Sequence, residues 1–405
     1  MKQIDYFSPT SADNRRVWAQ IDLDALVNNY IVSRDYIHAH NPNTPAVAVI
    51  KADAYGHGIE ACARALYDCG CRHFAVACAE EGVAIREALS YTDSSDALVL
   101  ILGYTTPEYA ALLDRYALTQ TLFCADYAKD LHAAAKAANV KLPVHVKIDT
   151  GMHRIGYPAF TPEQAAQTVL EIASLYEQCD AFEIQGLFTH LSDADSGNFC
   201  YEQWQRYLLV KQGLEAIGKC PPICHACNSP GCMRYPETYL DGVRLGALLF
   251  GVAPAIPPEV DRNPMCNLFP AHLLRPVMRL QTSVIHTHTV AAGEPVGYGA
   301  LCRADHDRTI ATLSAGYADG WLRAYANTNV TLHTAQGDFT VPMVGRICMD
   351  LCMVDVTGLP CRPGDTVTLF GNDVQSIASL AKHAGSIAYE VPCLVTARVP
   401  RIYHK

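Results

Sequence analysis

The sequence predicts an α/β protein, a (β/α)8 TIM-like barrel followed by a mainly β C-terminal domain. Two observations predict it. Eight short apolar runs alternate with helical patterns in the first two-thirds of the chain, and strand patterns dominate beyond residue 265. An open, doubly wound sheet also fits alternation, but eight units within about 250 residues favour closure into a barrel.

The eight apolar runs are the predicted barrel strands. They are short, rich in β-branched residues and mostly apolar on both faces, as strands of a helix-covered parallel sheet are. They occupy residues 46–50, 73–77, 98–102, 119–123, 144–148, 184–189, 223–226 and 243–245.

Amphipathic segments between the runs predict the helices. The stretch at residues 21–37 places Leu23, Leu26 and Tyr30 on one helical face. The stretch "TPEQAAQTVLEIASLYEQ" begins with an N-cap threonine, a proline at the first helical position and a capping-box glutamine.

A Pro-rich connection, "VAPAIPPEVDRNP", separates this region from the second domain. We expect a boundary there, with a barrel domain at residues 1–265 and a β domain at residues 266–405. The strands expected in the second domain are residues 277–288, 309–313, 329–334, 340–344, 349–356 and 366–370, with one helix around residues 374–383.

Composition limits the classes of partner. The net charge is −10 and no dense Lys/Arg tract occurs, which argues against a nucleic-acid or anionic-membrane partner. We identify no signal peptide and no apolar run of the roughly 20 residues that span a bilayer. Seventeen cysteines then indicate a reducing, cytoplasmic compartment and mostly free thiols. One CxxC, "CHAC", has no second pair at zinc-ribbon spacing, so we expect no metal site.

Polar residues end five of the eight predicted strands. In a parallel barrel these ends meet at one rim, where active sites form. The candidates are Lys51 and Tyr55 after the first strand, Lys147, Asp149 and Arg154 at the fifth, His190 after the sixth, His225, Asn228 and Ser229 at the seventh, and Arg244 and Gly246 at the eighth.

Lys51 ends the stretch "AVAVIKADAYGHG" and is the most informative of these residues. A desolvated lysine is a nucleophile toward carbonyl groups, although Lys51 could instead pair with Asp53. Ser229, Gly246 and Tyr55 can hold a phosphate through N–H and O–H donors. A carbonyl-reactive lysine opposite a phosphate site is what pyridoxal phosphate requires.

The motif set resembles the alanine racemase family of fold-type III pyridoxal-phosphate enzymes. The resemblance rests on "AVIKADAYGHG", "KIDTGMHRIG", "GLFTHLSDAD", "HACNSPG", "VRLGALLFG", "GYGA", "AGYADGW", "VGRICMDLCMVDV" and "YEVPC…RVPRIY", which occur in the family's order over nearly the whole chain. It implies a barrel followed by a β domain, assembled head-to-tail as a homodimer.

The resemblance also implies roles for single residues. Lys51 matches the lysine that binds the cofactor and acts as one base, and Tyr298 matches the opposing base from the second subunit. Arg244 matches the arginine that bonds the pyridine nitrogen. His190 matches the histidine that links this arginine to the tyrosine. The other implied cofactor-binding residues are Tyr55, Arg154, Asn228, Ser229, Gly246, Ala247 and Tyr389. Arg154 is implied at the substrate carboxylate. Met349 matches a backbone donor to that carboxylate from the second subunit, with Asp350 beside it. Lys147 matches a lysine carbamylated in many members.

The implied activity is pyridoxal-phosphate-dependent racemisation of L- and D-alanine by two bases, which would supply D-alanine for peptidoglycan. A serine or broad-specificity racemase is an alternative because His153 replaces the usual residue of the arginine loop. A fold-type III decarboxylase and a non-catalytic cofactor-binding protein are further alternatives. Leu351 stands where the family commonly has glutamine, so carbamylation of Lys147 stays open. We interpret His225 as a packing residue.

Overall fold

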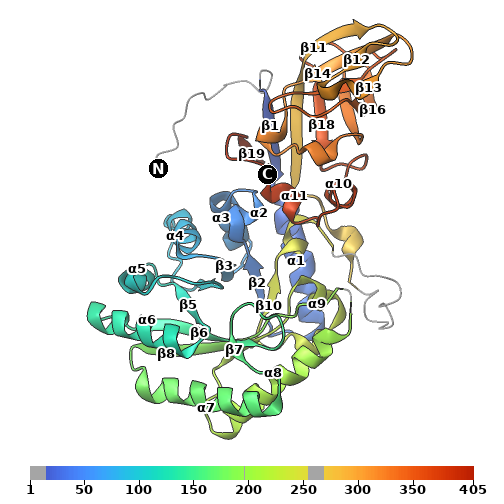
Figure 1. Ribbon diagram of the computed structural model, residues 1–405. Helices are drawn as coiled ribbons and strands as arrows, with labels where there is room; N and C mark the ends of the chain where they lie inside the picture. The colour runs from blue at the N-terminus through green and yellow to red at the C-terminus, as the bar shows by residue number, and fades with distance from the viewer. Residues whose placement is uncertain (1–14, 196, 254–268) are drawn as a thin grey trace. The chain divides into compact units, whose positions relative to one another are not determined.

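The computed structural model describes residues 15–195, 197–253 and 269–405, which form two compact units (Figure 1). The barrel unit holds Ala25–Ala54 and Gly58–Arg275. The β unit holds the described residues up to Asp24, the short segment Tyr55–His57, and Pro276–Lys405. The expected boundary between residues 265 and 266 lies outside the described residues.

Eight of the nine described strands of the barrel unit form the parallel barrel, and the predicted barrel is confirmed; the ninth, β7 (Tyr157–Pro158), lies off this path and pairs with one barrel strand. In sheet order the eight barrel strands are β2 (Ala46–Val49), β3 (His73–Val76), β4 (Leu98–Ile101), β5 (Thr119–Leu122), β6 (Leu142–Asp149), β8 (Phe182–Phe188), β9 (Ile223–His225) and β10 (Val243–Leu245). β10 pairs back onto β2. Backbone hydrogen bonds from Asp241 N to Cys224 O (2.9 Å) and from Arg244 N to Cys227 O (3.1 Å) bring β10 beside β9 and close the ring.

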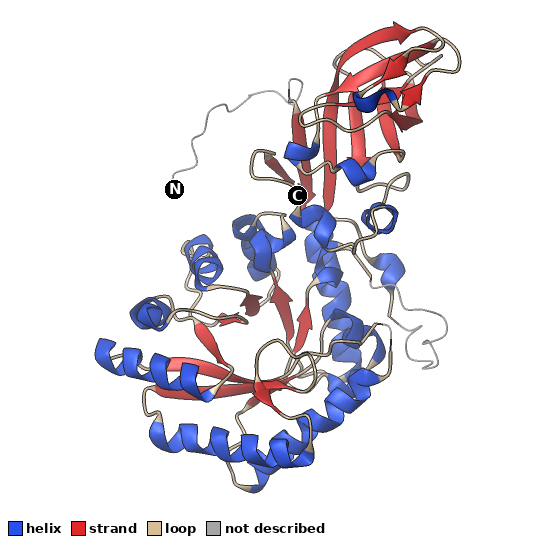
Figure 2. Cartoon of the chain, viewed as in Figure 1, coloured by secondary structure: helices blue, strands red, loops and turns tan. Residues whose placement is uncertain are grey.

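Helices surround these strands (Figure 2). They are α1 (Leu23–His40), α3 (Ile59–Asp68), α4 (Ala79–Ala88), α5 (Ala110–Arg115), α6 (Ala125–Ala138), α7 (Pro162–Gln178), α8 (Phe199–Ala216) and the short α9 (Ser229–Arg234). On α1, Leu26 and Tyr30 are buried as expected. α7 begins as predicted, with Thr161 Oγ1 accepting a hydrogen bond from Gln164 N at 3.3 Å.

The β unit is built on one eight-stranded sheet. Its order is β14 (Arg308–Leu313), β17 (Cys352–Asp355), β16 (Gly337–Val344), β15 (Asn329–Thr334), β18 (Thr366–Phe370), β11 (Met278–Val290), β1 (Val17–Asp22) and β19 (Arg401–His404). β14 also pairs with β11, so six of these strands form a closed ring. The one helix predicted near the C-terminus is α10 (Ile377–His383). A small hairpin of β12 (Pro295–Val296) and β13 (Cys302–Arg303) lies between β11 and β14 in sequence.

The structure corrects two expectations. Residues 17–22 fall within the range expected for the barrel domain, but they form β1, which pairs with β11 and β19 in the β unit. Its partner Thr282 lies far along the chain from Val17, and local periodicity carries no information about such pairing. The strand expected at residues 349–356 begins only at Cys352. The carbonyl groups of Cys348 and Met349 accept hydrogen bonds from a neighbouring turn at 3.0 Å each, so this segment forms a loop.

Gly56, just after the Lys51 turn, lies against the C-terminal segment of the β unit. Its φ is +81°, and a Cβ atom at this position would lie 2.2 Å from the carbonyl oxygen of Pro392. Arg401 Nε donates to the Gly56 carbonyl oxygen at 3.0 Å. Only glycine allows both the left-handed conformation and this approach of the two backbones.

We expect Gly56→Ala to lower the free energy of unfolding by about 2–4 kcal/mol, from left-handed strain plus the backbone clash. Gly70→Ala is the matched control, because Gly70 has φ +99° but no atom within 4 Å of the added Cβ. Strain alone should cost the control about 1 kcal/mol. Urea denaturation of both variants measures the difference, and equal losses would contradict the close approach.

Candidate active site

Lys51 begins a strained turn at the end of β2. The turn α2 (Lys51–Tyr55) runs left-handed, because Ala52 to Tyr55 all have φ between +52° and +54°. Each non-glycine residue in this conformation costs roughly 1–2 kcal/mol. Such strain persists only where surrounding contacts fix it, and it is typical of functional sites.

Glu81 and Asp53 fix this turn. Glu81, at the start of α4, accepts the Ala52 N–H at 2.6 Å and the Ala77 N–H at 2.8 Å, so one carboxylate joins the ends of β2 and β3. Asp53 Oδ1 accepts the Ile59 N–H at 2.7 Å. The Asp53 carboxylate, which the sequence suggested as an ion-pair partner of Lys51, thus binds the backbone that follows the turn.

Arg244 on β10 is the most constrained cation of the barrel. Its side chain is buried, and Nη2 donates to the carbonyl oxygens of Thr189 and Ala226 at 2.8 and 2.9 Å. Nη1 donates to His225 Nδ1 at 2.7 Å, and Nη2 approaches His190 Nδ1 at 3.4 Å. Burial lowers the pKa of Arg244 to about 10, so the guanidinium stays charged at neutral pH.

These contacts determine the tautomers of the histidines. Arginine only donates, so Nδ1 of both His190 and His225 must accept and the proton resides on Nε2. His225 Nε2 then donates to His145 Nδ1 at 3.0 Å. Burial, reinforced by Arg244, lowers the pKa of His190 and His225 well below the ordinary value. The imidazoles are therefore neutral, and His190 keeps an N–H to donate.

Lys147 on β6 is a buried lysine beside other cations. Burial, then Arg154 and Arg244, lower its pKa to about 7. Among the described residues, no carboxylate lies within ion-pair distance of its ammonium group. Asp149 on the same strand accepts backbone N–H bonds from Gly151 (2.9 Å), from His153 and from Arg154 (3.2 Å). This carboxylate folds the loop that carries Arg154.

Ser229 and Gly246 meet where the last two barrel strands end. Ser229 Oγ accepts the Gly246 N–H at 2.9 Å, and Ser229 and Ala247 are both buried. Asn228 has a structural task here. Its side chain accepts from Gly231 N at 3.1 Å and donates to Leu191 O at 2.9 Å, so its amide caps α9.

The remaining predicted site residues belong to the β unit. Tyr298 begins a 3₁₀ turn between two glycines of positive φ and is 69% exposed. Tyr389 precedes the short helix α11 (Glu390–Cys393). Burial raises the pKa of Tyr55, and Cys393 and Tyr389 raise it further. Met349 and Asp350 lie in the exposed loop before β17.

The donor set of the barrel unit fits a phosphate-bearing ligand. Lys51, Arg154 and Arg244 all act electrostatically on His190, and Lys147 joins them. The carboxylate of Asp149, on the same strand as Lys147, accepts backbone N–H groups. This excess positive charge, beside a hydroxyl and a strand-end backbone, suits an anion such as pyridoxal phosphate.

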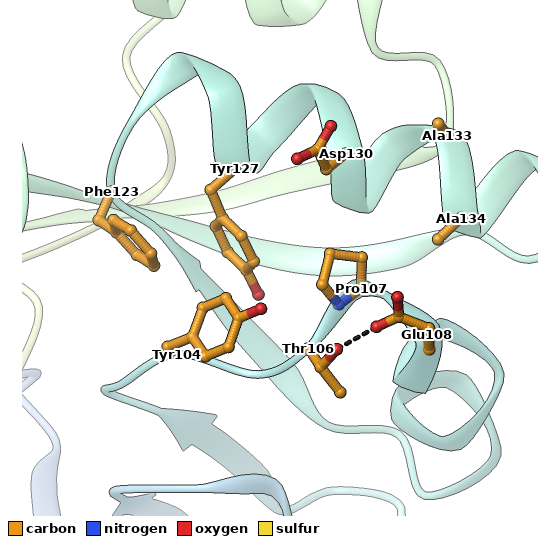
Figure 3. A pocket seen from close by; sticks show the side chains of 9 residues that line it. All are labelled: Tyr104, Thr106, Pro107, Glu108, Phe123, Tyr127, Asp130, Ala133 and Ala134. Atoms are coloured by element: carbon orange, nitrogen blue, oxygen red, sulfur yellow. Dashed lines mark hydrogen bonds between the residues drawn. The ribbon is translucent and has the colours of Figure 1, made fainter.

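A groove of about 740 Å³ in the barrel unit offers a second location (Figure 3). It is lined by Tyr104, Thr106, Pro107, Glu108, Phe123, Tyr127, Asp130, Ala133 and Ala134. Its aromatic rings pack together, with Phe123 and Tyr127 stacked at 4.6 Å. Two carboxylates and no lysine or arginine line it, so it would repel a phosphate. The chemistry therefore points to the cationic cluster.

Sequence reasoning missed three contributors to the site. His225 was interpreted as a packing residue; it stacks on Phe188 at 4.8 Å, but it also binds Arg244. Its place at the end of a barrel strand was the available signal. Glu81 and His145 act through backbone or imidazole contacts, for which no sequence motif exists.

The described residues include neither a metal-binding cluster nor a helix that could cross a membrane. No group of three or more His, Cys, Asp and Glu side chains there is arranged to hold a metal ion. None of the described helices combines the length and apolar character needed to cross a membrane. The described cysteines are free thiols.

Comparisons with known proteins match both units. The family described as "Alanine racemase, N-terminal domain" matches residues 21–254, and "Alanine racemase, C-terminal domain" matches residues 277–403. The alanine racemase of Desulfovibrio desulfuricans is 38% identical over 96% of this chain and 98% of its own. The solved alanine racemase of Clostridium difficile 630 superposes with a TM-score of 0.84 at 34% identity, covering 96% of each chain. The chain belongs to the alanine racemase family of isomerases.

Proposed function

We propose that the protein interconverts L- and D-alanine with pyridoxal phosphate bound at the barrel rim, and that it supplies D-alanine for peptidoglycan. The observation that carries this proposal is the bonding of Arg244. A guanidinium held by two carbonyl groups and two neutral imidazoles is a fixed donor that cannot readily release a proton. The family has its pyridine-nitrogen partner at this position.

The residues present fit the cofactor. Lys51 would bind it covalently, and Arg244 would face its ring nitrogen. The Ser229 hydroxyl and the backbone at Gly246 and Ala247 would hold the phosphate, together with the hydroxyls of Tyr55 and Tyr389, while Asn228 holds α9 in place. Bound pyridoxal phosphate draws electron density away from the substrate Cα–H bond. Because Arg244 would donate to the ring nitrogen without protonating it, this withdrawal would stay moderate, which would limit side reactions.

Racemisation needs a base on each face of the substrate Cα. Lys51 would remove or return the proton on one face, and Tyr298 of a second subunit would do so on the other. His190 Nε2–H is a donor that can hold the tyrosine oxygen in place. Arg154 and the Met349–Asp350 loop would bind the substrate carboxylate.

The exposure of the β-unit residues supports a homodimer with shared active sites. Tyr298 is 69% exposed and Met349 is 54% exposed, so both side chains are accessible to a second subunit. A role in a partner's active site would cover both. We further propose a cytoplasmic location, supported by the free thiols.

The alternatives differ in product. The serine-racemase alternative rests on His153, whose ring packs on Phe160 with 4.4 Å between the ring centroids. That contact favours a structural role for His153 and hence alanine as the main substrate. A decarboxylase would release CO₂ and an amine, and a non-catalytic binding protein would leave the amino acid unchanged.

Chiral chromatography after incubation with L-alanine and cofactor tests the proposal. We expect D-alanine to accumulate to an equal amount, with L-serine converted more slowly. Release of CO₂, or unchanged L-alanine in the presence of bound cofactor, would contradict it.

Tyr298→Phe should lower kcat by about 10²–10⁴-fold, as loss of a general base does. The visible absorbance of the lysine-bound cofactor should persist, because Tyr298 is proposed to act on the substrate proton and not to hold the cofactor. Tyr201→Phe is the control, since Tyr201 is a similarly exposed tyrosine on α8. Loss of cofactor absorbance in Tyr298→Phe would instead indicate a structural role.

Lys147 provides a pH-dependent test. Its pKa of about 7 leaves the amine largely neutral at about pH 8, and only a neutral amine reacts with CO₂. We expect ¹³C-bicarbonate to give a carbamate NMR signal at that pH, weaker at lower pH and absent from Lys147→Ala. Lys382→Ala, on α10, should keep the signal. If the wild-type spectrum lacks the carbamate signal, Lys147 is an unmodified, neutral amine at that pH.

A further inference from the structure

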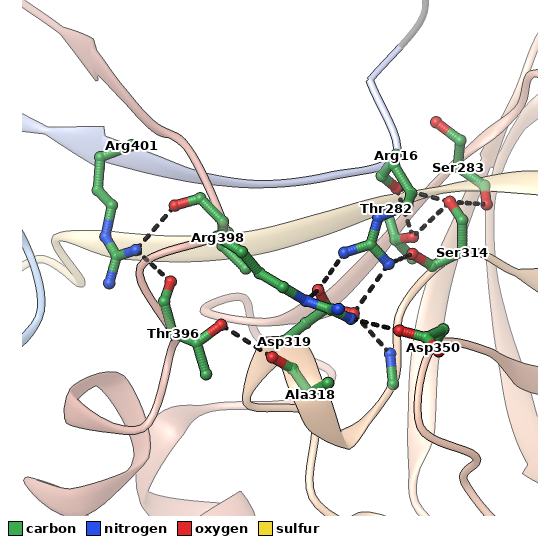
Figure 4. A network of polar contacts seen from close by, with 12 residues as sticks. Arg16, Thr282, Ser283, Ser314, Ala318, Asp319, Asp350, Thr396, Arg398 and Arg401 are labelled. Atoms are coloured by element: carbon green, nitrogen blue, oxygen red, sulfur yellow. Dashed lines mark hydrogen bonds and ion pairs between the residues drawn. The ribbon is translucent and has the colours of Figure 1, made fainter. Parts of the chain in front are cut away.

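An ionic network centred on one buried carboxylate lies in the β unit and includes Asp350, which follows Met349 (Figure 4). Its centre is Asp319, whose carboxylate is fully buried in the 3₁₀ turn Tyr317–Asp319. The carboxylate accepts hydrogen bonds from Arg16, from Arg398 Nε at 2.7 Å and from Gly316 N at 2.9 Å. Burial alone would raise the pKa of Asp319, but the two arginines lower it overall, so the carboxylate stays ionised.

Arg398 extends this network to the loop. Its Nη2 donates to Asp350 Oδ1 at 2.7 Å while its Nε binds Asp319. One planar guanidinium therefore links a buried, immobile carboxylate to an exposed one. Lysine could not make both bonds in this fork geometry.

The opposite side of the loop is held by backbone contacts. Tyr317 N donates to Cys348 O and Ala318 N donates to Met349 O, both at 3.0 Å. A Cβ atom on Gly316 would lie 2.3 Å from Met349 O, so the turn and the loop are packed backbone to backbone. The Asp319 turn thus holds the loop directly, and Arg398 holds it through Asp350.

Two adjacent backbone donors of the loop remain unused. Within the described parts of the chain, the N–H groups of Met349 and Asp350 have no hydrogen-bond partner, and Met349 is 54% exposed. Successive free N–H groups form a site for an anion. The Asp350 carboxylate would oppose an anion there, and pairing with Arg398 offsets its charge.

We propose that Asp319 and Arg398 are positioning residues that hold the Met349–Asp350 loop ready to bind the substrate carboxylate. This inference rests on the proposed function, in which that loop contacts the substrate. Arg398 acts twice, by fixing the loop to Asp319 and by neutralising Asp350. Neither residue touches the reacting atoms, so the effect belongs mainly to substrate binding.

Arg398→Met tests the inference in the full-length, cofactor-loaded protein. We expect KM for alanine to rise about tenfold or more, the scale of one lost charge-assisted hydrogen bond, with kcat changed less than about threefold. Cofactor absorbance should be unchanged. Arg362→Met is the matched control, because Arg362 is an exposed arginine of the same unit paired with Asp365. It should leave KM at the wild-type value.

A double-mutant cycle with Asp350→Asn supplies a readout that a purely structural role would not move. The double variant should raise KM no more than Arg398→Met alone, because both changes break one contact. Additive effects, or an unchanged KM in Arg398→Met, would overturn the inference. If Arg398→Met does not fold, Arg398→Lys with Asp350→Asn completes the same cycle. Wild-type protein without racemase activity would instead refute the proposed function.

Discussion

The buried guanidinium of Arg244 constrains the rest of the barrel site. It is charged, desolvated and bonded on several sides, and the histidines that it contacts must be neutral. Because it only donates, it also fixes which nitrogen of each imidazole carries the proton. Burial, reinforced by Arg244, lowers the pKa of His190, and burial, followed by Arg154 and Arg244, lowers the pKa of Lys147.

Strain and support are divided between the two units. In the barrel unit, the left-handed turn after Lys51 is held by Glu81 and Asp53 through backbone N–H groups. In the β unit, the loop of Met349 is held by the Asp319 turn and by Arg398. In both places, a carboxylate that is not proposed to bind the substrate fixes the backbone next to a proposed site residue.

The barrel could be predicted because its strands are local. Each of the eight runs ends within two residues of its expected position, since burial on both faces leaves an apolar signature in the sequence itself. The pairing of β1 with β11 and the loop that replaces residues 349–351 of an expected strand depend on distant partners. The bond between Asp319 and Arg398 joins residues 79 positions apart, which no motif reports. Similarly, sequence identifies His225 as a strand-end residue but not as the partner of Arg244.

The site depends on His190 and His225 staying neutral, through burial and the charge of Arg244 together, with the proton on Nε2. ¹⁵N NMR of histidine-labelled protein measures this directly, because the two ring nitrogens of each tautomer have distinct shifts. We expect both histidines to show a protonated Nε2 and an unprotonated Nδ1, unchanged between about pH 5 and 8. Imidazolium signals that titrate near the ordinary histidine pKa of about 6.5 would contradict the account.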